Sequence, residues 1–135
     1  MEKSHGIDAV LAKSRLDVRR LTPQETVAAV GQGALLVDTR TETQRADQGE
    51  LPGALVIDRT VLEWRLDPTS DARIPEATDA DLEIVVVCRQ GYSSSLAAAS
   101  LREVGLWRAT DMIGGVEAWL DAGLPLATGP ADVRR

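Results

Sequence analysis

The residue best suited to covalent chemistry is Cys88, the one cysteine of the 135-residue chain. It follows an apolar, β-branched run at 84–87, which predicts a buried strand, and an alanine-rich stretch at 96–100 predicts a helix further on. Between them we predict a substrate-binding loop of Arg89, Gln90, Gly91, Tyr92, Ser93 and Ser94. A cysteine between a strand end and a helix N-terminus meets backbone N–H groups and the positive end of the helix dipole. The sequence therefore predicts a reactive thiolate.

Each loop residue has a chemical use beside a thiolate. A helix terminus contributes at most about 2 kcal/mol, which would lower the pKa of a free cysteine from about 8.5 to roughly 7. Reactive cysteines go lower, so we expect loop N–H groups and the Arg89 guanidinium to add to the helix. Gly91 allows the backbone to turn its amides inward, because glycine reaches positive φ at little cost. Ser93 and Ser94 can donate hydroxyls and cap the helix, and Tyr92 can shape the pocket entrance.

Other cysteine chemistries are excluded by what the sequence lacks. A single cysteine rules out an internal disulfide, a Cys-x-x-Cys redox pair and a cysteine zinc cluster. The one histidine, His5, lies far along the chain from Cys88, which argues against a cysteine protease with a histidine base. We expect neither a metal nor an organic cofactor.

The composition is that of a globular protein of one domain. Hydrophobic residues make up 44% and charged residues 27% of the chain. A formal net charge of -6 argues against nucleic-acid binding, since phosphates require a basic face. No apolar run approaches the roughly 20 residues of a membrane span, and the first residues lack the apolar stretch of a signal peptide. We therefore expect a cytoplasmic protein that binds neither nucleic acid nor membrane.

The elements that must position Cys88 follow from apolar patterning and turn residues. Thr22, Pro23 and Glu25 form a capping box, which predicts a helix from Pro23 to about Val30. Other helices are predicted over 6–15, 60–66, 93–105 and 116–121. Strands are predicted over 34–37, 54–57, 84–87 and 109–113, with a polar excursion at 39–50 and a surface loop at 68–80. This alternation predicts an α/β fold with a largely parallel sheet covered on both faces.

In such a sheet the functional site lies beyond the carboxyl ends of the strands. Asp38, Asp58 and Cys88 are all predicted there. Asp38 and Arg40 are better explained by structural pairing at that end of the sheet than by catalysis. Arg59 and Trp64 follow the strand at 54–57 and could line the mouth of the pocket.

Several further side chains are interpreted as structural. Trp107 and Trp119 stand among apolar neighbours, which predicts that they pack in the interior. Arg45 and the pair at 134–135 are predicted to be solvated surface charges, although Arg45 could reach an anionic substrate.

Four short motifs stand in order along the chain. They are Asp38-Thr39-Arg40, GELPGA at 49–54, VVVCRQGYS at 85–93 and GGVEAW at 114–119. Together they resemble the single-domain rhodanese (thiosulfate sulfurtransferase-like) family, whose signature GHIPGA is similar to the second motif. The resemblance covers roughly 21–126 and implies a rhodanese-like α/β fold with a five-stranded, largely parallel sheet. It divides the chain into an N-terminal extension with a short helix (1–20), a rhodanese domain (21–128) and a C-terminal tail (129–135).

The resemblance implies a sulfurtransferase with Cys88 as its nucleophile. Such a cysteine takes a sulfane sulfur from a small sulfur-containing anion such as thiosulfate, and holds it as a persulfide. It then passes the sulfur to a thiol, cyanide or protein acceptor, a cycle that needs a thiolate and an anion-binding loop but no general base. Two departures, Glu50 in place of the usual histidine and Gln44 in place of a common glutamate, bear on substrate preference and local packing.

The loop also distinguishes related chemistries on this fold. Related phosphatases place an arginine six residues after the cysteine, and here that position is Ser94, which argues against phosphoryl transfer. The resemblance implies that a six-residue loop, here 88–93, accepts sulfur-sized substrates, whereas a longer loop accepts phosphate or arsenate. Two alternatives stay open: a non-catalytic rhodanese-fold module that binds a partner or presents sulfur, and a redox sensor in which Cys88 reacts with peroxide.

Overall fold

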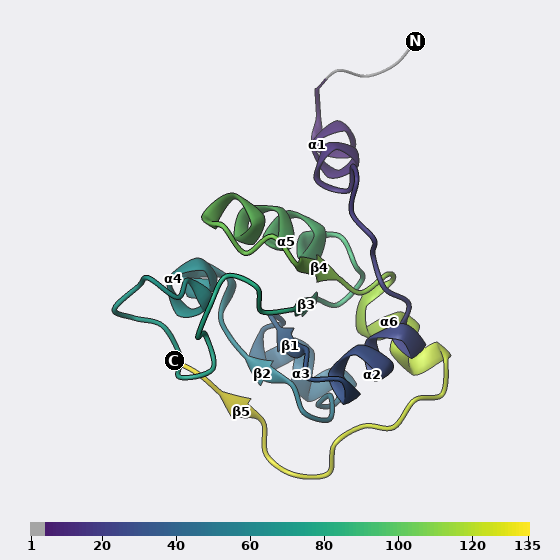
Figure 1. Cartoon of the computed structure of the whole chain (residues 1–135). Coiled ribbons are helices and arrows are strands. Elements are labelled where there is room, and N and C mark those ends of the chain that lie inside the picture. Colours follow the sequence, from purple (N-terminus) through teal and green to yellow (C-terminus); the bar gives the residue numbers. More distant parts are fainter. Residues whose placement is uncertain (1–4) are drawn as a thin grey trace.

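The computed structural model of the chain describes residues 5–135 and contains a five-stranded sheet. The strands are β1 (Leu35–Asp38), β2 (Leu55–Val56), β3 (Ile84–Val87), β4 (Ala109–Asp111) and β5 (Asp132–Val133). Neighbouring strands are parallel throughout, in the order β4-β3-β1-β2-β5 (Figure 1). Because parallel strands all end on the same side, Asp38, Cys88 and Asp111 lie at one end of the sheet.

Helices pack on both faces of this sheet, which confirms the predicted fold class (Figure 1). They are α1 (Ile7–Ser14), α2 (Pro23–Gly31), α3 (Glu42–Gln48), α4 (Leu62–Leu66), α5 (Ser93–Val104) and α6 (Gly115–Asp121), and a 3-10 turn, η1 (Arg59–Val61), precedes α4. Side chains alternate along β3, so Ile84 and Val86 join a core with α4 and α5. Val85 and Val87 join a second core with α6 and the inner side of α2. The apolar run at 84–87 is uninterrupted because both faces of β3 are buried.

The helix starts follow local hydrogen-bonding rules. At α2, Glu25 N–H donates to Thr22 Oγ1 over 3.1 Å, and Thr22 N–H donates to Glu25 Oε1 over 2.9 Å. This confirms the predicted capping box. The helix predicted over 6–15 is confirmed as α1.

The polar excursion predicted over 39–50 contains a helix that the sequence pattern did not predict, α3. Thr41 and Gln44 form a second capping box, with hydrogen bonds of 3.1 and 3.0 Å. Arg45 is the buried residue of α3, so the apolar periodicity that marks most helices is missing. The polar composition of α3 therefore did not predict a helix, although α3 begins with a capping box as α2 does.

The strand β5 lies in the stretch 129–135 that the sequence assigns to a tail. It pairs with β2, and Arg134 N–H donates to Val56 O over 2.8 Å. Arg134 also donates to both carboxylate oxygens of Glu76, over 2.8 and 2.6 Å. The prediction of a solvated pair at 134–135 is therefore wrong for Arg134, whose side chain is 24% exposed.

The two tryptophans predicted to pack in the interior behave differently. Trp119 is buried at 3% exposure and donates its indole N–H to Pro125 O over 3.0 Å. Trp107 is 63% exposed and donates to Asp81 Oδ1 over 2.8 Å, so the prediction is wrong there. Trp107 sits in the turn between α5 and β4, where it extends over the surface.

Candidate active site

Cys88 directly follows β3, and the loop 88–94 wraps around its sulfur. The residue is 6% exposed. Gly91 N–H donates to Cys88 Sγ over 3.1 Å, and the Cys88 thiol donates to Ser94 Oγ over 3.2 Å. A backbone amide and a hydroxyl therefore already contact the sulfur, in the strand–loop–helix arrangement expected from the sequence.

The start of α6 supports the loop from one side. Gly91 adopts a φ of 86°, and a Cβ there would lie 2.7 Å from Gly114 N. A Cβ on Gly115 would lie 2.5 Å from Cys88 O, and Val116 N–H donates to that same oxygen over 3.0 Å. The two glycines of the motif GGVEAW are thus explained by close packing of two backbone segments, which larger residues would prevent.

Burial of the sulfur raises the pKa of Cys88, but hydrogen bonds to the thiolate outweigh it, so that the net pKa is lowered. The donors are the Ser94 and Ser93 hydroxyls and the N–H groups of Ser94 and Gly91. The twelve-residue helix α5 begins at Ser93, so its positive end also faces the loop. The local structure therefore favours the thiolate, as the sequence predicts.

The Ser94 hydroxyl is shared between the sulfur and a buried carboxylate. It donates to Asp111 Oδ2 over 2.7 Å while it accepts from the Cys88 thiol. A carboxylate only accepts and a hydroxyl carries a single proton, so ionisation of Cys88 requires this proton to turn toward the sulfur. The Ser94 hydroxyl is thus bonded to Cys88 and Asp111 and does not cap α5. The start of α5 has no side-chain cap, so the capping role predicted for Ser93 and Ser94 is wrong.

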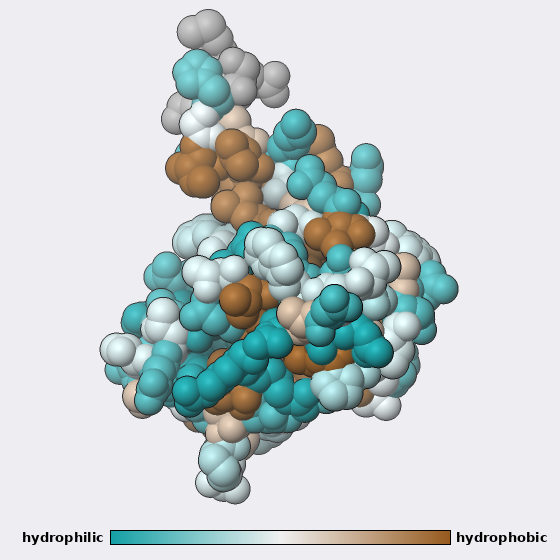
Figure 2. Space-filling view, turned by 90° about the vertical axis from the view of Figure 1, so that its left-hand side faces the viewer, coloured by the Kyte–Doolittle hydropathy of each residue, from teal (hydrophilic) through white to brown (hydrophobic). Residues whose placement is uncertain are grey.

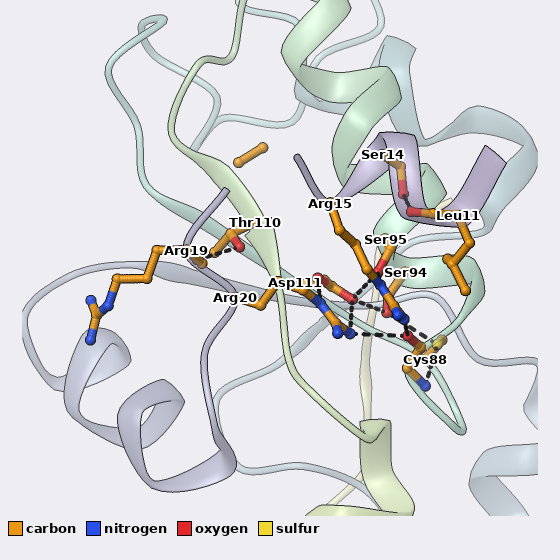
Figure 3. Close-up of polar contacts among 12 residues, drawn as sticks. Leu11, Ser14, Arg15, Arg19, Arg20, Cys88, Ser94, Ser95, Thr110 and Asp111 are labelled. Atoms are coloured by element: carbon orange, nitrogen blue, oxygen red, sulfur yellow. Dashed lines mark hydrogen bonds and ion pairs between the residues drawn. The ribbon is translucent and has the colours of Figure 1, made fainter. Parts of the chain in front are cut away.

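Asp111, at the end of β4, is the centre of a hydrogen-bond network behind the loop (Figure 3). It is 1% exposed and accepts from the Ser95 hydroxyl over 2.9 Å. Arg20 donates to both of its carboxylate oxygens, over 2.8 and 3.1 Å. This ion pair neutralises the buried carboxylate and ties the segment before α2 to the start of α5.

A cavity of about 250 Å³ opens above the sulfur. Its lining residues come from the loop, from the segment after β1 and from the first turn of α3: Thr39, Arg40, Gln44, Cys88, Arg89, Gln90, Tyr92 and Ser93. Most of the predicted loop residues therefore meet around one small space. The volume suits a small anion better than a large organic substrate.

Arg89 and Tyr92 form the exposed rim of this cavity. The Arg89 side chain is 43% exposed and lies 3.6 Å from Asp47 and 3.4 Å from Glu117. Exposed pairs of this kind are weak, at roughly 0–1 kcal/mol, so Arg89 can exchange them for an incoming anion. Tyr92 is 60% exposed, as expected for a side chain at the tip of a loop.

Asp38 and Arg40 form a closed, buried pair beside the cavity. Both side chains are 0% exposed, and Arg40 contacts both carboxylate oxygens, with the shortest distance 2.7 Å. Arg40 also donates to Gly49 O over 2.9 Å and to Gln48 Oε1 over 3.3 Å. The pair therefore holds the chain around α3.

Arg59 and Trp64 do not line the cavity beside Cys88. Arg59 pairs with Glu63 over 2.9 Å, and Trp64 is 60% exposed elsewhere on the surface. They follow β2, which β1 separates from β3 in the sheet. Their predicted place at the mouth is wrong, because strand order and not sequence order decides which strand ends are neighbours.

The two departures from the family pattern have structural partners. Glu50 accepts from Arg45 over 2.8 Å, and Arg45 is 9% exposed, so the prediction of a solvated Arg45 is wrong. Gln44 caps α3 with its side-chain oxygen and also lines the cavity. Only the second departure touches the space in which a substrate would bind.

Sequence reasoning missed Asp111, Arg20 and Arg15 as neighbours of the catalytic loop. Asp111 lies inside the strand predicted over 109–113, whereas the observed β4 ends at Asp111, so a strand two residues shorter would have placed it at the same end of the sheet as Asp38. No local signal marks the two arginines, which lie more than one element away from Cys88 along the chain.

Within the described residues 5–135, no cluster of three or more His, Cys, Asp or Glu side chains is arranged to hold a metal ion. Nor does this part of the chain contain a helix long and apolar enough to cross a membrane.

The chain belongs to the rhodanese family, since residues 22–122 match the family described as the Rhodanese-like domain. It is 33% identical over 113 residues to the thiosulfate sulfurtransferase GlpE of Haemophilus influenzae (strain PittEE), covering 84% of this chain and 98% of that protein. It is 38% identical over 92 residues to a sulfurtransferase of Allochromatium vinosum, covering 68% and 77% of the two chains. These single-domain relatives support the expected enzyme class, a rhodanese-type sulfurtransferase.

Solved structures give the same fold. A Rhodopseudomonas palustris protein of unknown function, described as a possible tyrosine phosphatase, has a TM-score of 0.81 at 30% identity and covers 94% of this chain and 98% of its own. The human single-domain sulfurtransferase has a TM-score of 0.63 at 27% identity, with coverage of 76% and 95%.

Proposed function

We propose that this protein moves a sulfane sulfur from a thiosulfate-like donor to a nucleophilic acceptor through a persulfide on Cys88. The observation that carries the proposal is the sulfur of Cys88 in contact with Gly91 N–H and Ser94 Oγ at the floor of a small cavity. A thiolate there is stabilised by preorganised donors, and the same donors can stabilise the negative charge of a persulfide.

The first half-reaction conserves charge and needs no added proton. The Cys88 thiolate attacks the outer sulfur of thiosulfate, a new S–S bond forms at Cys88, and the S–S bond of thiosulfate breaks. The bonding electron pair leaves with sulfite, and Cys88 becomes a persulfide anion. In the second half-reaction a thiol or cyanide attacks the outer sulfur of this persulfide, which restores the Cys88 thiolate.

The loop residues divide this work according to their positions. Gly91, Ser93 and Ser94 supply donors to the sulfur, whereas Arg89 and Gln90 lie where the sulfonate of the donor would enter. Arg89 is placed to attract the anionic donor and to release sulfite through the exposed rim. The proposal keeps the sequence-based expectation of a cytoplasmic enzyme that needs no metal, membrane or nucleic acid.

Phosphate-ester hydrolysis, suggested for the Rhodopseudomonas palustris protein, is disfavoured for this chain. A phosphate needs a guanidinium fork inside the loop. The position six residues after Cys88 is Ser94, whose hydroxyl bonds to Asp111 behind the loop. Arg15 and Arg20 reach the loop but bond to the carbonyl of Gly91. A phosphatase assay should therefore give no turnover.

The proposal is tested by incubation of the purified protein with thiosulfate followed by intact-mass measurement. We expect the mass of one added sulfur atom, located at Cys88 and removed by cyanide or a thiol. The Cys88→Ser variant, which keeps the size of the side chain, should neither gain mass nor consume thiosulfate. Thiosulfate consumption that persists in Cys88→Ser would overturn the assignment.

The same samples separate the alternatives. A non-catalytic sulfur-presenting module would take up sulfur once and would not turn over with any member of an acceptor panel. A redox sensor would show Cys88 oxidation by peroxide that is faster than persulfide formation. Multiple turnovers with thiosulfate and cyanide would exclude both.

A further inference from the structure

Two arginines that precede the family-matching residues 22–122 reach the outside of the catalytic loop. Arg15 donates to Gly91 O over 2.8 Å, and Arg20 donates to the same oxygen over 3.1 Å (Figure 3). One backbone carbonyl in the middle of the loop thus accepts from two guanidinium groups. The family pattern does not include either residue.

The position of this carbonyl bears directly on the anion site. In a trans peptide the C=O and the following N–H point in opposite directions, and no peptide bond of the described chain is cis. With Gly91 O directed at the two guanidinium groups, Tyr92 N–H points away from them. Tyr92 is also one of the residues that line the cavity beside Cys88. The arginines can therefore orient a donor of the loop without touching the substrate.

We call residues 7–21, which carry these arginines, the N-terminal arm; its last residue, Leu21, is buried in the core, and the residues before it are held by several polar contacts. Arg102 donates to Ser14 O over 2.7 Å, and Thr110 Oγ1 donates to Arg19 O over 2.8 Å. Leu21 N–H donates to Asp111 O over 3.1 Å, which brings Arg20 beside the Asp111 carboxylate. The arm therefore reaches the loop along the edge of the sheet, next to β4.

The helix of the arm is weakly packed. None of the residues of α1 is buried, and Ile7 and Val10 are 67% and 51% exposed. Figure 2 shows hydrophobic surface on the helix that projects from the top of the molecule. With so little apolar burial, contacts such as those of Arg15 and Arg20 contribute a large share of the attachment of the arm.

Arg15 differs from Arg20 in its charge balance. Arg20 is paired with Asp111, whereas Arg15 donates to Ser95 Oγ over 3.0 Å and to Gly91 O. Among residues 5–135, Arg15 forms no ion pair with a carboxylate. Its positive charge therefore has no direct carboxylate partner among these residues, and it lies directly behind the loop around Cys88.

We propose that Arg15 and Arg20 are positioning residues that hold the Gly91 carbonyl outward, so that the loop amides of the catalytic site stay directed at the anionic substrate. The N-terminal arm then contributes to the active site by orienting its loop. The inference rests on the proposed function of Cys88, because it concerns the same anion-binding loop.

The test compares the alkylation of Cys88 by iodoacetate, an anion, with its alkylation by iodoacetamide, which is neutral. The ratio of the two rates reports on anion binding by the loop and does not require sulfur transfer. In Arg15→Ala we expect this ratio to fall about tenfold, the effect of losing one charge-assisted hydrogen bond. The thiosulfate KM should rise by a similar factor, with a smaller change in kcat.

The arm provides a matched control and a graded rescue. Arg19 lies on the same segment, but its side chain is 76% exposed, pairs with Glu25 and points away from the loop (Figure 3). Arg19→Ala should leave the ratio unchanged. Arg15→Lys should give an intermediate ratio, because an ammonium group lacks the planar fork that bridges Gly91 O and Ser95 Oγ. Arg20→Lys avoids leaving Asp111 without a counter-charge.

The outcomes are distinct. An unchanged ratio in a folded Arg15→Ala protein overturns the proposal, as does an equal fall in Arg19→Ala, which would indicate a general effect of net charge. A loss of melting temperature with no change in the ratio would assign Arg15 a purely structural role and also overturn it. Wild-type protein that prefers iodoacetate in an Arg15-dependent way but takes up no sulfur would overturn the function of Cys88 and support the role of the arm.

Discussion

Two aspartates end parallel strands and pair with arginines, yet they serve different regions. Asp38 ends β1 and pairs with Arg40, two residues further along the chain. Asp111 ends β4 and pairs with Arg20, which is 91 residues away. The first ion pair is local and the second is formed by the tertiary fold.

The remaining contacts of the two pairs explain the difference. Arg40 donates onward to Gly49 O and Gln48, so the first pair closes the segment around α3 and is fully buried. Asp111 instead accepts from Ser94 and Ser95 at the start of the helix behind Cys88. The same chemical pair thus stabilises the fold at one strand end and organises the catalytic loop at another.

The largest expected effect is the loss of stability in Asp38→Ala. This change leaves Arg40 buried with an unpaired charge, which should lower the free energy of unfolding by about 3–5 kcal/mol. Urea denaturation measures the loss. Asp111→Ala is the comparison and should lose less, about 1–3 kcal/mol, because the Arg20 side chain is 16% exposed and keeps Gly91 O as an acceptor. Equal losses would contradict the division between the two pairs.

An intermediate effect is expected for Ser94→Ala, which separates the Asp111 network from the sulfur. The variant loses a hydroxyl donor to the thiolate, so the pKa of Cys88 should rise. Because the thiolate is the reactive form, the iodoacetamide rate should fall at neutral pH and reach the wild-type plateau at higher pH. A pH profile of alkylation measures this, and an unchanged midpoint would remove Ser94 from thiolate stabilisation.

The smallest effect is expected for Arg89→Ala. The Arg89 side chain contacts two carboxylates, those of Asp47 of α3 and Glu117 of α6. The exposed pairs contribute about 0–1 kcal/mol, so the melting temperature should change little. The thiosulfate KM should rise by a few-fold, because the rim loses the cation that attracts the donor. Steady-state kinetics test this, and an unaltered KM would exclude Arg89 from donor binding.

The parts of the site that could be predicted are those encoded by consecutive residues. The apolar run of β3, the glycine of the loop and the alanine-rich α5 each have local causes, namely burial, backbone freedom and helix propensity. The helix α3 has a local cause as well in its Thr41–Gln44 capping box, but its buried face carries Arg45 and no apolar stripe. Here the pattern of hydrophobic residues was the wrong signal.

The parts that could not be predicted depend on which strands become neighbours. β5 is two residues long, and its assignment rests on pairing with β2. Arg59 follows β2 and was expected near Cys88, but β1 lies between β2 and β3. Two-residue strands and exposed arginines carry no pattern of their own from which a position in the sheet can be inferred.

By itself, the sequence determined the strand–loop–helix unit around Cys88 and the class of fold, because each follows from burial and backbone preferences over a few residues. Only the tertiary structure decided that Asp111, Arg20 and Arg15 stand behind the loop. The Arg20–Asp111 pair joins residues 91 positions apart, and bringing them together costs more chain entropy than the ion pair alone offsets. It therefore forms only once packing of the sheet has brought the partners together.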